Sequence, residues 1–349
     1  MTPNPPASAT IRDVARQCGL SISTVSHVLN HHTGRYSAET ADKVWVAVHE
    51  LGYVPNHIGR MLRKGNDWLL GALVPNLENV FYADMIRALD LSAQRRARLL
   101  LTVSLGDDFG LQEQTIRSLR GAMLSGLVVI GTTPRELHHV MTLAHPETPL
   151  VFVNRGSEGF YAGHYGIGID NYEAGRALGA YLRHHGCQRV AILRGPDYSY
   201  ASRQRYEGFV AGATGTSRDV TIVYDEPVML TAAAGFERAA TVCQLHPDGI
   251  FCGNDMVALG VAQYCMVAGL HVPQDILITG FDYNSLTRIV GRRLVTIEQP
   301  VDQMAQRIVA WLSDYARGSH TPVRERVEFR LVVPSSASSQ GSPTPSHDK

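Results

Sequence analysis

From Leu69 onward, short aliphatic and β-branched runs alternate with stretches of helical periodicity, and this alternation limits the fold more than any other feature of the chain. Strands are predicted at 69–74, 98–103, 126–131, 150–154, 190–195, 221–225, 249–253 and 276–281. Helices are predicted at 80–95, 110–123, 171–186, 201–213, 232–245, 255–269 and 301–317. Because alternating strands and helices favour parallel strand pairing, the pattern predicts an α/β body with parallel sheets covered on both faces.

This body, residues 67–334, is too long for one ordinary hydrophobic core, so we expect two α/β lobes. Ligands of such folds bind beyond the carboxyl ends of the strands, which places the expected site in the cleft between the lobes. The body contains no G-x-G-x-x-G after its first strand, no P-loop and no G-x-S-x-G. The strand ends also lack an acid–base pair beside a nucleophile. The sequence therefore favours a binding protein without cofactor or metal over an enzyme.

The first part of the chain, residues 10–54, has a different pattern. In "TIRDVARQCGLSISTVSHVLN", Thr10 can cap a first helix with Asp13 three residues later, and Gly19 breaks it. A second helix follows to Leu29, and a third begins after Ser37. Two short helices around a glycine-bearing turn, with a supporting third helix, predict an all-α helix-turn-helix head that binds DNA. A generic three-helix bundle is the alternative.

Charge and cysteine content agree with this division. Residues 1–66 carry seven Lys/Arg against four Asp/Glu, and the remainder carries 25 against 28, so a polyanion is expected to bind the head alone. The five cysteines are scattered and odd in number, which is typical of reduced thiols in the cytoplasm. No signal peptide or membrane-spanning run is predicted. Residues 1–9 and the Ser/Pro-rich residues 335–349 are predicted to be disordered.

The head resembles that of the LacI/GalR family of bacterial transcription regulators over about 45 consecutive residues, including "SAETADKVWVAVHELGYVPN". The resemblance implies that Ile22, Ser23 and His27 read bases, and that Thr24, Ser26 and Asn30 contact phosphates or the groove edge. Ile22 can contact only a thymine methyl group, because it has no hydrogen-bonding side chain. The loop "HHTGRYS" is one residue longer than the family's usual spacing, so contacts of His31, His32 and Arg35 are not assigned.

Residues 55–66 contain "PNHIGRMLRKG", an amphipathic basic stretch too short for a stable isolated helix. It aligns with the family's hinge helix, which orders in the minor groove of the operator. The resemblance implies that Leu62 wedges into the central base step and that Asn56, His57 and Arg60 contact the backbone or groove edges. Gly59 replaces the usual alanine, so this hinge is expected to fold less readily. A plain linker is the alternative.

The body resembles the family's effector domain, which is similar to periplasmic sugar-binding proteins, in "GIGIDNYEAGRALGAYL", "IFCGNDMVALG" and "HVPQDILITGFD". Seven effector-site residues are implied by this resemblance: Phe81, Tyr82, Asn154, Arg155, Arg205, Asp255 and Asp282. Aromatic faces, carboxylates and guanidinium groups suit a polyol. In the alternative interpretation Phe81 and Tyr82 are core residues and Arg155 is a surface cation. Asn254 is expected to cap the following helix.

Departures from the family pattern leave the effector open. Asn154 stands where many members have aspartate, and Leu230 replaces an aromatic found in some. Arg292 and Arg293 add charge where an apolar approach is usual. We expect a carbohydrate or sugar acid, with a nucleobase-like corepressor as the alternative. A small-molecule receptor without operator binding is the other alternative. The resemblance implies a cytoplasmic homodimeric repressor, associated with the nucleoid through a palindromic operator. The tail lacks the apolar heptads of a tetramer.

Overall fold

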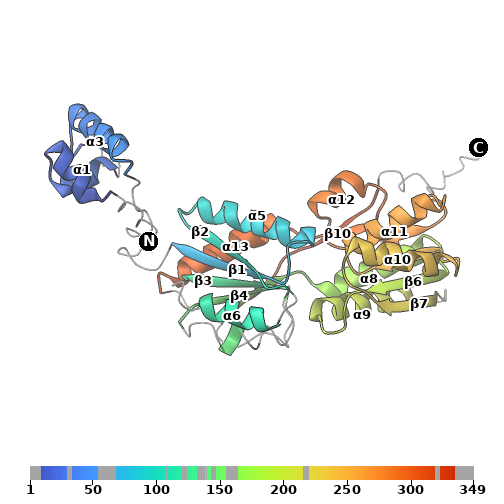
Figure 1. Cartoon of the computed structure of the whole chain (residues 1–349). Helices are drawn as coiled ribbons and strands as arrows, with labels where there is room; N and C mark the ends of the chain where they lie inside the picture. Colours follow the sequence, from blue (N-terminus) through green and yellow to red (C-terminus); the bar gives the residue numbers. More distant parts are fainter. Residues whose placement is uncertain are drawn as a thin grey trace, which may run out of the picture. The chain divides into compact units, whose positions relative to one another are not determined.

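A computed structural model of the chain (Figure 1) describes residues 9–29, 34–53, 68–106, 109–119, 124–131, 138, 140–142, 147–154, 164–214, 220–318 and 323–334. The chain divides into two compact units, Met1–Gly65 and Asn66–Lys349. The predicted disordered ends and the predicted hinge helix lie outside the described residues, except for residue 9.

The first unit contains three helices: α1 (Ile11–Cys18), α2 (Ile22–Leu29) and α3 (Ala38–Glu50). The Asp13 carboxylate accepts hydrogen bonds from the backbone N–H and the hydroxyl of Thr10, which fixes the start of α1. Gly19 ends α1 in the left-handed conformation, with φ 66°, as the tight turn requires. The Ser37 hydroxyl accepts a hydrogen bond from the Thr40 N–H and caps α3.

A small apolar core holds the three helices together. Each helix contributes residues to this core: Val14 and Ala15 from α1, Val25, Val28 and Leu29 from α2, and Val44, Ala47 and Val48 from α3. These are the buried positions expected from the helical periodicity. The predicted head is therefore observed as a helix-turn-helix unit with one common core.

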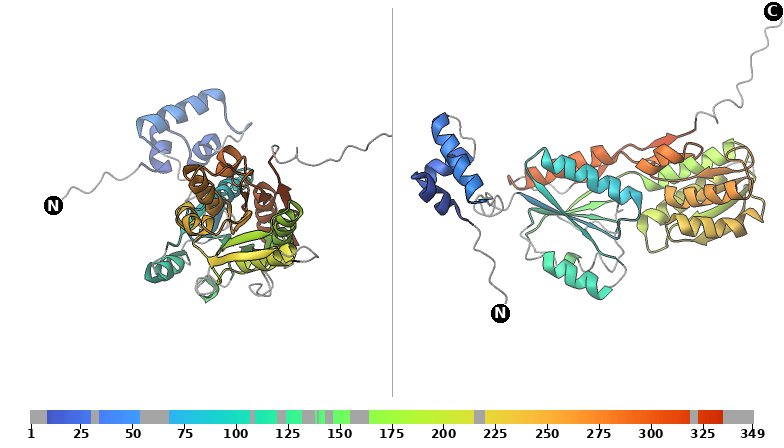
Figure 2. Two further views of the ribbon diagram at one scale, coloured as in Figure 1. Left: turned by 90° about the vertical axis from the view of Figure 1, so that its right-hand side faces the viewer. Right: turned by 45° about the horizontal axis from the view of Figure 1, so that its top comes forward.

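The second unit has two lobes. The N-lobe is built on a sheet of order β11-β5-β4-β3-β1-β2. Its strands are β1 (Leu69–Val74), β2 (Leu99–Ser104), β3 (Gly126–Ile130), β4 (Leu150–Val153), β5 (Tyr165–Gly168) and β11 (Arg324–Arg326), and each neighbouring pair is parallel. Helices α5 (Val80–Gln94) and α13 (Val301–Tyr315) cover one face, while α6 (Phe109–Leu119) covers the other (Figure 2).

The C-lobe has a parallel sheet of order β7-β6-β8-β9. Its strands are β6 (Arg189–Arg194), β7 (Thr221–Pro227), β8 (Gly249–Cys252) and β9 (Leu277–Thr279). Its helices are α8 (Asn171–His184), α9 (Tyr200–Thr214), α10 (Ala232–Cys243), α11 (Asp255–Val267) and α12 (Ser285–Val290). In Figure 1, α8 and α9 lie on one face of this sheet and α10 and α11 on the other.

The described chain passes between the lobes at three points. It runs from β5 into α8, from β10 (Thr296–Glu298) into α13, and from β11 into β12 (Arg330–Val332). Strands β10 and β12 pair antiparallel and form part of these connections. The sequence pattern missed β5, β10, β11, β12 and α12. Each is only three to six residues long, and too few residues are present for periodicity to distinguish them from loops.

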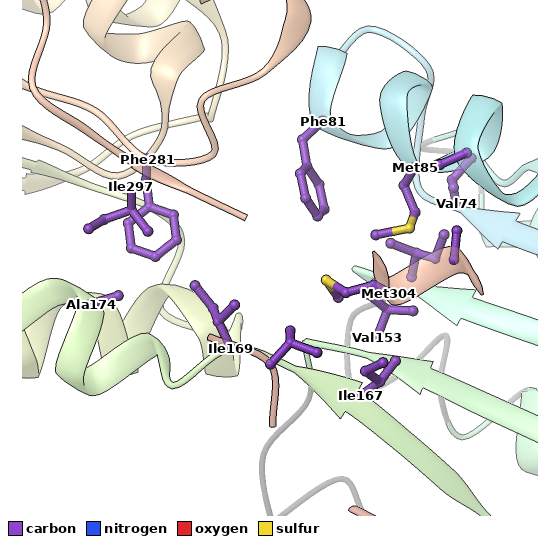
Figure 3. Close-up of a cluster of buried hydrophobic side chains, with 14 of the residues drawn as sticks. Val74, Phe81, Met85, Val153, Ile167, Ile169, Ala174, Phe281, Ile297 and Met304 are labelled. Atoms are coloured by element: carbon purple, nitrogen blue, oxygen red, sulfur yellow. The ribbon is translucent and has the colours of Figure 1, made fainter. Parts of the chain in front are cut away.

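One hydrophobic cluster extends through both lobes. Figure 3 shows Phe81, Met85 and Val74 of the N-lobe on one side, Phe281 and Ile297 on the other, and Ile169 of the first crossover between them. The connections are therefore packed into the core rather than exposed as linkers. This packing holds the carboxyl ends of the two sheets facing a common cleft.

Candidate functional site

The first candidate site is the exposed start of α2. The Ser21 hydroxyl accepts a hydrogen bond from the Thr24 N–H at 3.1 Å and also lies 2.8 Å from the Thr24 hydroxyl, so the helix begins in a fixed conformation. Ile22 is 46% exposed, although a large apolar side chain usually lies in the core. Ser23 beside it is also exposed. The helix therefore presents an apolar contact and a hydroxyl at its N-terminal end.

The other predicted DNA contacts are placed less uniformly. Ser26 and His27 are half-buried on α2. Arg12, Arg16 and Lys43 are exposed on the same unit, where Arg16 pairs with Asp13 and Lys43 pairs with Glu39. Asn30 of the helix-turn-helix head and the hinge residues Asn56, His57, Arg60 and Leu62 lie outside the described residues.

The second candidate site is a cavity at the cleft between the lobes, with a volume of about 70 Å³. Both lobes line it, and its wall consists of Asn79, Phe81, Tyr82, Ile130, Gly131, Val153, Asn154, Ser199, Tyr200, Ala201, Ser202, Arg205, Leu230, Asn254 and Asp282. Five of the seven predicted effector residues, Phe81, Tyr82, Asn154, Arg205 and Asp282, are brought together here. Arg155 lies outside the described residues.

Arg205 is the most strongly anchored side chain of this wall. Its Nε donates to Asn171 Oδ1 at 2.9 Å, and its Nη1 donates to the Gly253 carbonyl at 3.1 Å. The guanidinium carbon lies 3.7 Å from the centre of the Phe281 ring. Burial lowers the pKa of Arg205, and the nearby Asp282 carboxylate opposes this effect. The side chain is thus held as a rigid buried cation that can orient a polar ligand.

Asp282 supplies the opposite charge. Its Oδ1 lies 3.8 Å from Arg205 Nη2 and accepts a hydrogen bond from Gln299 Nε2 at 2.7 Å. Burial raises the pKa of Asp282 to about 6, while Arg205 counteracts the rise. Its φ of 113° lies in a region that non-glycine residues rarely adopt. Such a conformation persists only where the surroundings impose it, and this is common at binding sites.

Asp255 lies behind the cavity rather than on its wall. Its Oδ1 accepts a hydrogen bond from the Thr296 hydroxyl at 2.6 Å, and its Oδ2 accepts one from the Asn284 N–H at 3.2 Å. Burial, followed by the charge of Asp282, raises its pKa to about 7. The structure therefore gives Asp255 a supporting position beneath the site, where it ties α11 to the segments before α12 and within β10.

Asn154 directly follows β4, and its side chain reaches the connection between β10 and α13. Its Nδ2 donates to Gln299 Oε1 at 2.7 Å. Its Oδ1 is buried and has no hydrogen-bond partner among the described residues. A buried acceptor without a partner costs about 1–3 kcal/mol of stability. A ligand that donates a hydrogen bond to Oδ1 would remove this cost.

Sequence reasoning missed several wall residues. Ser199, Tyr200 and Ser202 lie at the start of α9, and Asn79 caps α5 by accepting from the Phe81 N–H at 3.0 Å. Gln299 contacts the site through both Asn154 and Asp282. Isolated hydroxyls and amides in loops carry no sequence pattern. Gln299 lies in "LVTIEQP", a stretch too short for periodicity to single out this residue.

The remaining residues singled out in the sequence lie either at the cavity or in a separate groove of the C-lobe. Asn254 caps α11 as predicted, since its Oδ1 accepts from the Val257 N–H at 3.0 Å, and it also reaches the cavity. Phe81 belongs both to the core and to the cavity wall, so the two interpretations of this residue are compatible. Leu230 lines the cavity, whereas Arg292 and Arg293 line a separate apolar groove on the C-lobe.

Comparison with known proteins gives a consistent result for both units. Residues 10–56 match the lacI family of bacterial regulatory proteins, and residues 180–336 match a periplasmic binding protein-like domain. The ribose operon repressor of Escherichia coli (strain K12) is 30% identical over 301 residues, which cover 85% of this chain and 90% of that protein. The chain belongs to the lacI family. It is a DNA-binding transcription regulator.

A second relative supports this assignment, and a solved structure shares the fold. The HTH-type transcriptional repressor PurR of Vibrio vulnificus (strain CMCP6) is 32% identical over 297 residues, covering 84% of this chain and 87% of that protein. A lac repressor dimer bound to operator and the anti-inducer ONPF has the same fold, with a TM-score of 0.78 at 23% identity. That alignment covers 93% of this lacI-family chain and 97% of the lac repressor chain.

The described residues hold neither a membrane-spanning helix nor a metal cluster. No helix among them is long and apolar enough to cross a membrane. Within the same residues, no group of three or more His, Cys, Asp or Glu side chains is arranged to hold a metal ion.

Proposed function

We propose that this lacI-family chain is a homodimeric repressor that reads a palindromic operator and whose operator affinity is set by a small polar effector in the cleft. The observation that carries this proposal is the buried Arg205–Asp282 pair, which faces a cavity lined by both lobes. A ligand that contacts both lobes favours one lobe arrangement over another, and this difference in affinity is what can shift a regulator between two states.

The wall chemistry favours a sugar. Phe81 and Tyr82 offer aromatic surface to C–H groups, whereas Asn154, Arg205 and Asp282 offer donors and acceptors to hydroxyls. The ribose operon repressor among the relatives agrees with this class. A nucleobase is the second candidate, because PurR is equally similar and the same aromatic and amide groups suit a flat heterocycle. Sugar acids are included among the candidate effectors because the guanidinium group of Arg155, a predicted site residue, could pair with a carboxylate.

Ligand entry requires a change in the cleft. The cavity encloses about 70 Å³. Small-molecule sites commonly measure about 300 Å³ or more. We infer that the lobes part, or that wall side chains turn, to admit an effector.

We infer that the protein performs no catalysis and acts in the bacterial cytoplasm on chromosomal DNA. The wall contains one carboxylate and one guanidinium group that bind each other, and this pairing leaves neither as a general base beside a nucleophile among the described wall residues. A turnover assay with sugars and nucleosides should show no product. Accumulation of product that the Arg205→Ala variant does not form would contradict this inference.

A thermal-shift screen tests the effector class. Ribose, other pentoses and hexoses, sugar acids and purine bases should be compared at several concentrations, since stabilisation grows with ln(1 + [L]/Kd). The Arg205→Ala variant should lose the response to the active compound. Stabilisation by a purine base alone would favour the second candidate, and stabilisation of the Arg205→Ala variant equal to wild type would place the ligand elsewhere.

Operator binding is tested by gel shift on DNA upstream of the gene at several salt concentrations. A saturable complex on a palindromic segment is expected, with affinity that falls as salt rises. Unsaturable binding without a preferred palindrome would contradict the specific-repressor proposal. The direction of the effector's action, induction or corepression, follows from whether it weakens or strengthens this complex.

A further inference from the structure

Gln299 lies in the connection between β10 and α13, where the chain returns from the C-lobe to the N-lobe. Its side chain is 1% exposed and contacts one residue from each lobe. Asn154 of the N-lobe lies on one side, at 2.7 Å, and Asp282 of the C-lobe lies on the other, also at 2.7 Å. This connection between β10 and α13 is called the hinge segment below, and it is distinct from the predicted hinge helix of residues 55–66. One buried amide in the hinge segment thus connects the two walls of the cleft.

The direction of these hydrogen bonds follows from chemistry. An ionised carboxylate only accepts hydrogen bonds, so Gln299 must turn its Nε2 toward Asp282. Its Oε1 then faces residue 154 and requires a donor there. Asn154 supplies that donor through Nδ2. With Asp282 ionised, an ionised aspartate at position 154 would place two acceptors against each other, whichever way the Gln299 amide turned.

The backbone of the hinge segment is also hydrogen-bonded to the Asp282 segment. The Asp282 N–H donates to the Ile297 carbonyl at 2.9 Å, and the Gln299 N–H donates to the Asp282 carbonyl at 3.3 Å. Gln299 is therefore fixed to the Asp282 segment through both its main chain and its side chain. Its contact with Asn154 joins this segment to the residue that follows β4 of the N-lobe sheet.

We propose that Gln299 is a positioning residue that sets the lobe arrangement through the chain Asn154–Gln299–Asp282, and that asparagine at 154 is required by the direction of this chain. The inference rests on the proposed effector-controlled function, because the chain ends at two effector-wall residues. An effector that donates to Asn154 Oδ1 or competes for Asp282 acts directly on a contact between the lobes.

The test reverses the direction of the hydrogen-bond chain Asn154–Gln299–Asp282. In Asn154→Asp this hydrogen-bond chain is broken at position 154. In the double variant Asn154→Asp/Asp282→Asn the charges are exchanged, so Gln299 Nε2 can donate to residue 154 and its Oε1 can accept from residue 282. The second substitution removes a charge beside Arg205, yet it is expected to repair the hinge. Asp282→Asn alone keeps the hydrogen bonds, because the amide oxygen introduced at position 282 can still accept from Gln299.

The measurement is amide hydrogen exchange of the hinge segment in the full chain, without effector or DNA. Asn154→Asp should speed exchange at residues 282 and 299 by about tenfold or more, the effect of losing one buried hydrogen bond. The double variant should return to within about threefold of wild type, because coupled partners deviate from additivity. Gln114→Glu, which adds the same charge on the exposed face of α6, should leave the hinge unchanged.

Two results would overturn the proposal. Exchange in the Asn154→Asp variant equal to wild type would show that the contact does not hold the hinge, and exchange in the double variant at least as fast as in Asn154→Asp would show that the chain's direction is irrelevant. If Asn154→Asp does not fold, a folded and protected double variant supports the proposal and an unfolded one contradicts it. Failure of wild type to bind any operator would defeat the proposed function while leaving the exchange result intact.

Discussion

Arg205, Asp255 and Asp282 are ionisable side chains buried together at the back of the cleft. Each is stable there because hydrogen bonds replace water, and Arg205 and Asp282 also have an opposite charge beside them. Arg205 and Asp282 pair directly, whereas Asp255 relies on Thr296 and Asn284. Burial, followed by repulsion from the Asp282 carboxylate, raises the pKa of Asp255.

The raised pKa values predict that stability increases as pH falls from 8 toward 6. The pKa values of Asp255, about 7, and Asp282, about 6, exceed the ordinary aspartate value of 3.8, so the folded state binds these protons more tightly. Their contribution is present in full at low pH and is lost as pH rises through 6 and 7. Urea unfolding of the full chain at pH 6, 7 and 8 measures it.

The control for this prediction is Asp255→Asn. This variant should lose about 1 kcal/mol per pH unit of the wild-type slope near pH 7, which is the order of magnitude for one proton. It keeps the size of the side chain and one of its two acceptor sites. An unchanged slope would show that Asp255 does not take up a proton on folding in this range.

At the scale of elements, α8 and α9 pack with their backbones in contact. Gly175 and Gly179 of α8 face the carbonyls of Arg205 and Phe209, and Gly208 and Gly212 of α9 face those of Tyr172 and Arg176. A Cβ at any of these four positions would overlap the opposing backbone. This packing sets the distance from Arg205 on α9 to Asn171 on α8, and hence the orientation of the guanidinium group.

Gly175→Ala is therefore expected to destabilise the protein by about 1–3 kcal/mol through overpacking. It should also weaken effector binding, because the added methyl group pushes against the backbone of Arg205 itself. Urea unfolding and effector titration measure the two effects. Gly260→Ala on α11 meets the Ala232 carbonyl in the same way and serves as the control. Its effector affinity should fall less at a similar loss of stability, and an equal fall would contradict the positioning role of Gly175.

The predicted hinge helix of residues 55–66 is an element on which we expect operator binding to depend. Leu62→Ala should reduce operator affinity by about tenfold or more, because the apolar wedge that offsets the cost of unstacking is lost. Effector affinity should stay unchanged. Gel shifts and effector titration on the same preparation compare the two. Parallel losses of both affinities would indicate a folding defect rather than a DNA contact.

Gly59→Ala should have the opposite effect on the same element. Alanine stabilises a helix by about 1 kcal/mol relative to glycine. Operator binding should therefore tighten and the response to effector should weaken. A variant with both properties unchanged would contradict the view that folding of the hinge is conditional on DNA.

At the scale of the whole molecule, the C-lobe exposes an apolar surface along α10, α11 and α12. Ile289, Val290 and Met266 are 69%, 61% and 66% exposed, and they border a groove of about 930 Å³. Contiguous apolar surface of this kind commonly marks a protein–protein interface. In the proposed homodimer, we expect this surface of the C-lobe to face the second chain.

Ile289→Asp should convert the dimer to monomers, since a charge at the centre of an apolar interface is costly to bury. Because Ile289 is exposed in the single chain, the fold should persist. Sedimentation and operator gel shifts should show monomers with weakened operator binding. Leu111→Asp, on exposed α6, is the matched control and should remain dimeric. A dimeric Ile289→Asp variant would exclude this surface from the interface.

The sequence by itself determined the elements whose signals are local. The helices of the head were predictable because Thr10, Gly19 and Ser37 act within their own turns. The long helices and buried strands of the body were predictable because periodicity and apolar runs report burial directly. Arg205 and Asp282 came from the family resemblance, and the structure places both on one cavity wall.

Only the tertiary structure decided which of these residues meet. Asp255 lies behind the cavity wall, where it accepts a hydrogen bond from Thr296, a residue 41 positions away. Gln299 belongs to the site because the segment between β10 and α13 passes between Asn154 and Asp282. The four glycines of α8 and α9 matter only because the two helices pack with their backbones in contact, which leaves no room for a Cβ. Contacts between distant segments depend on how the lobes pack, and a single sequence carries no local signal for them.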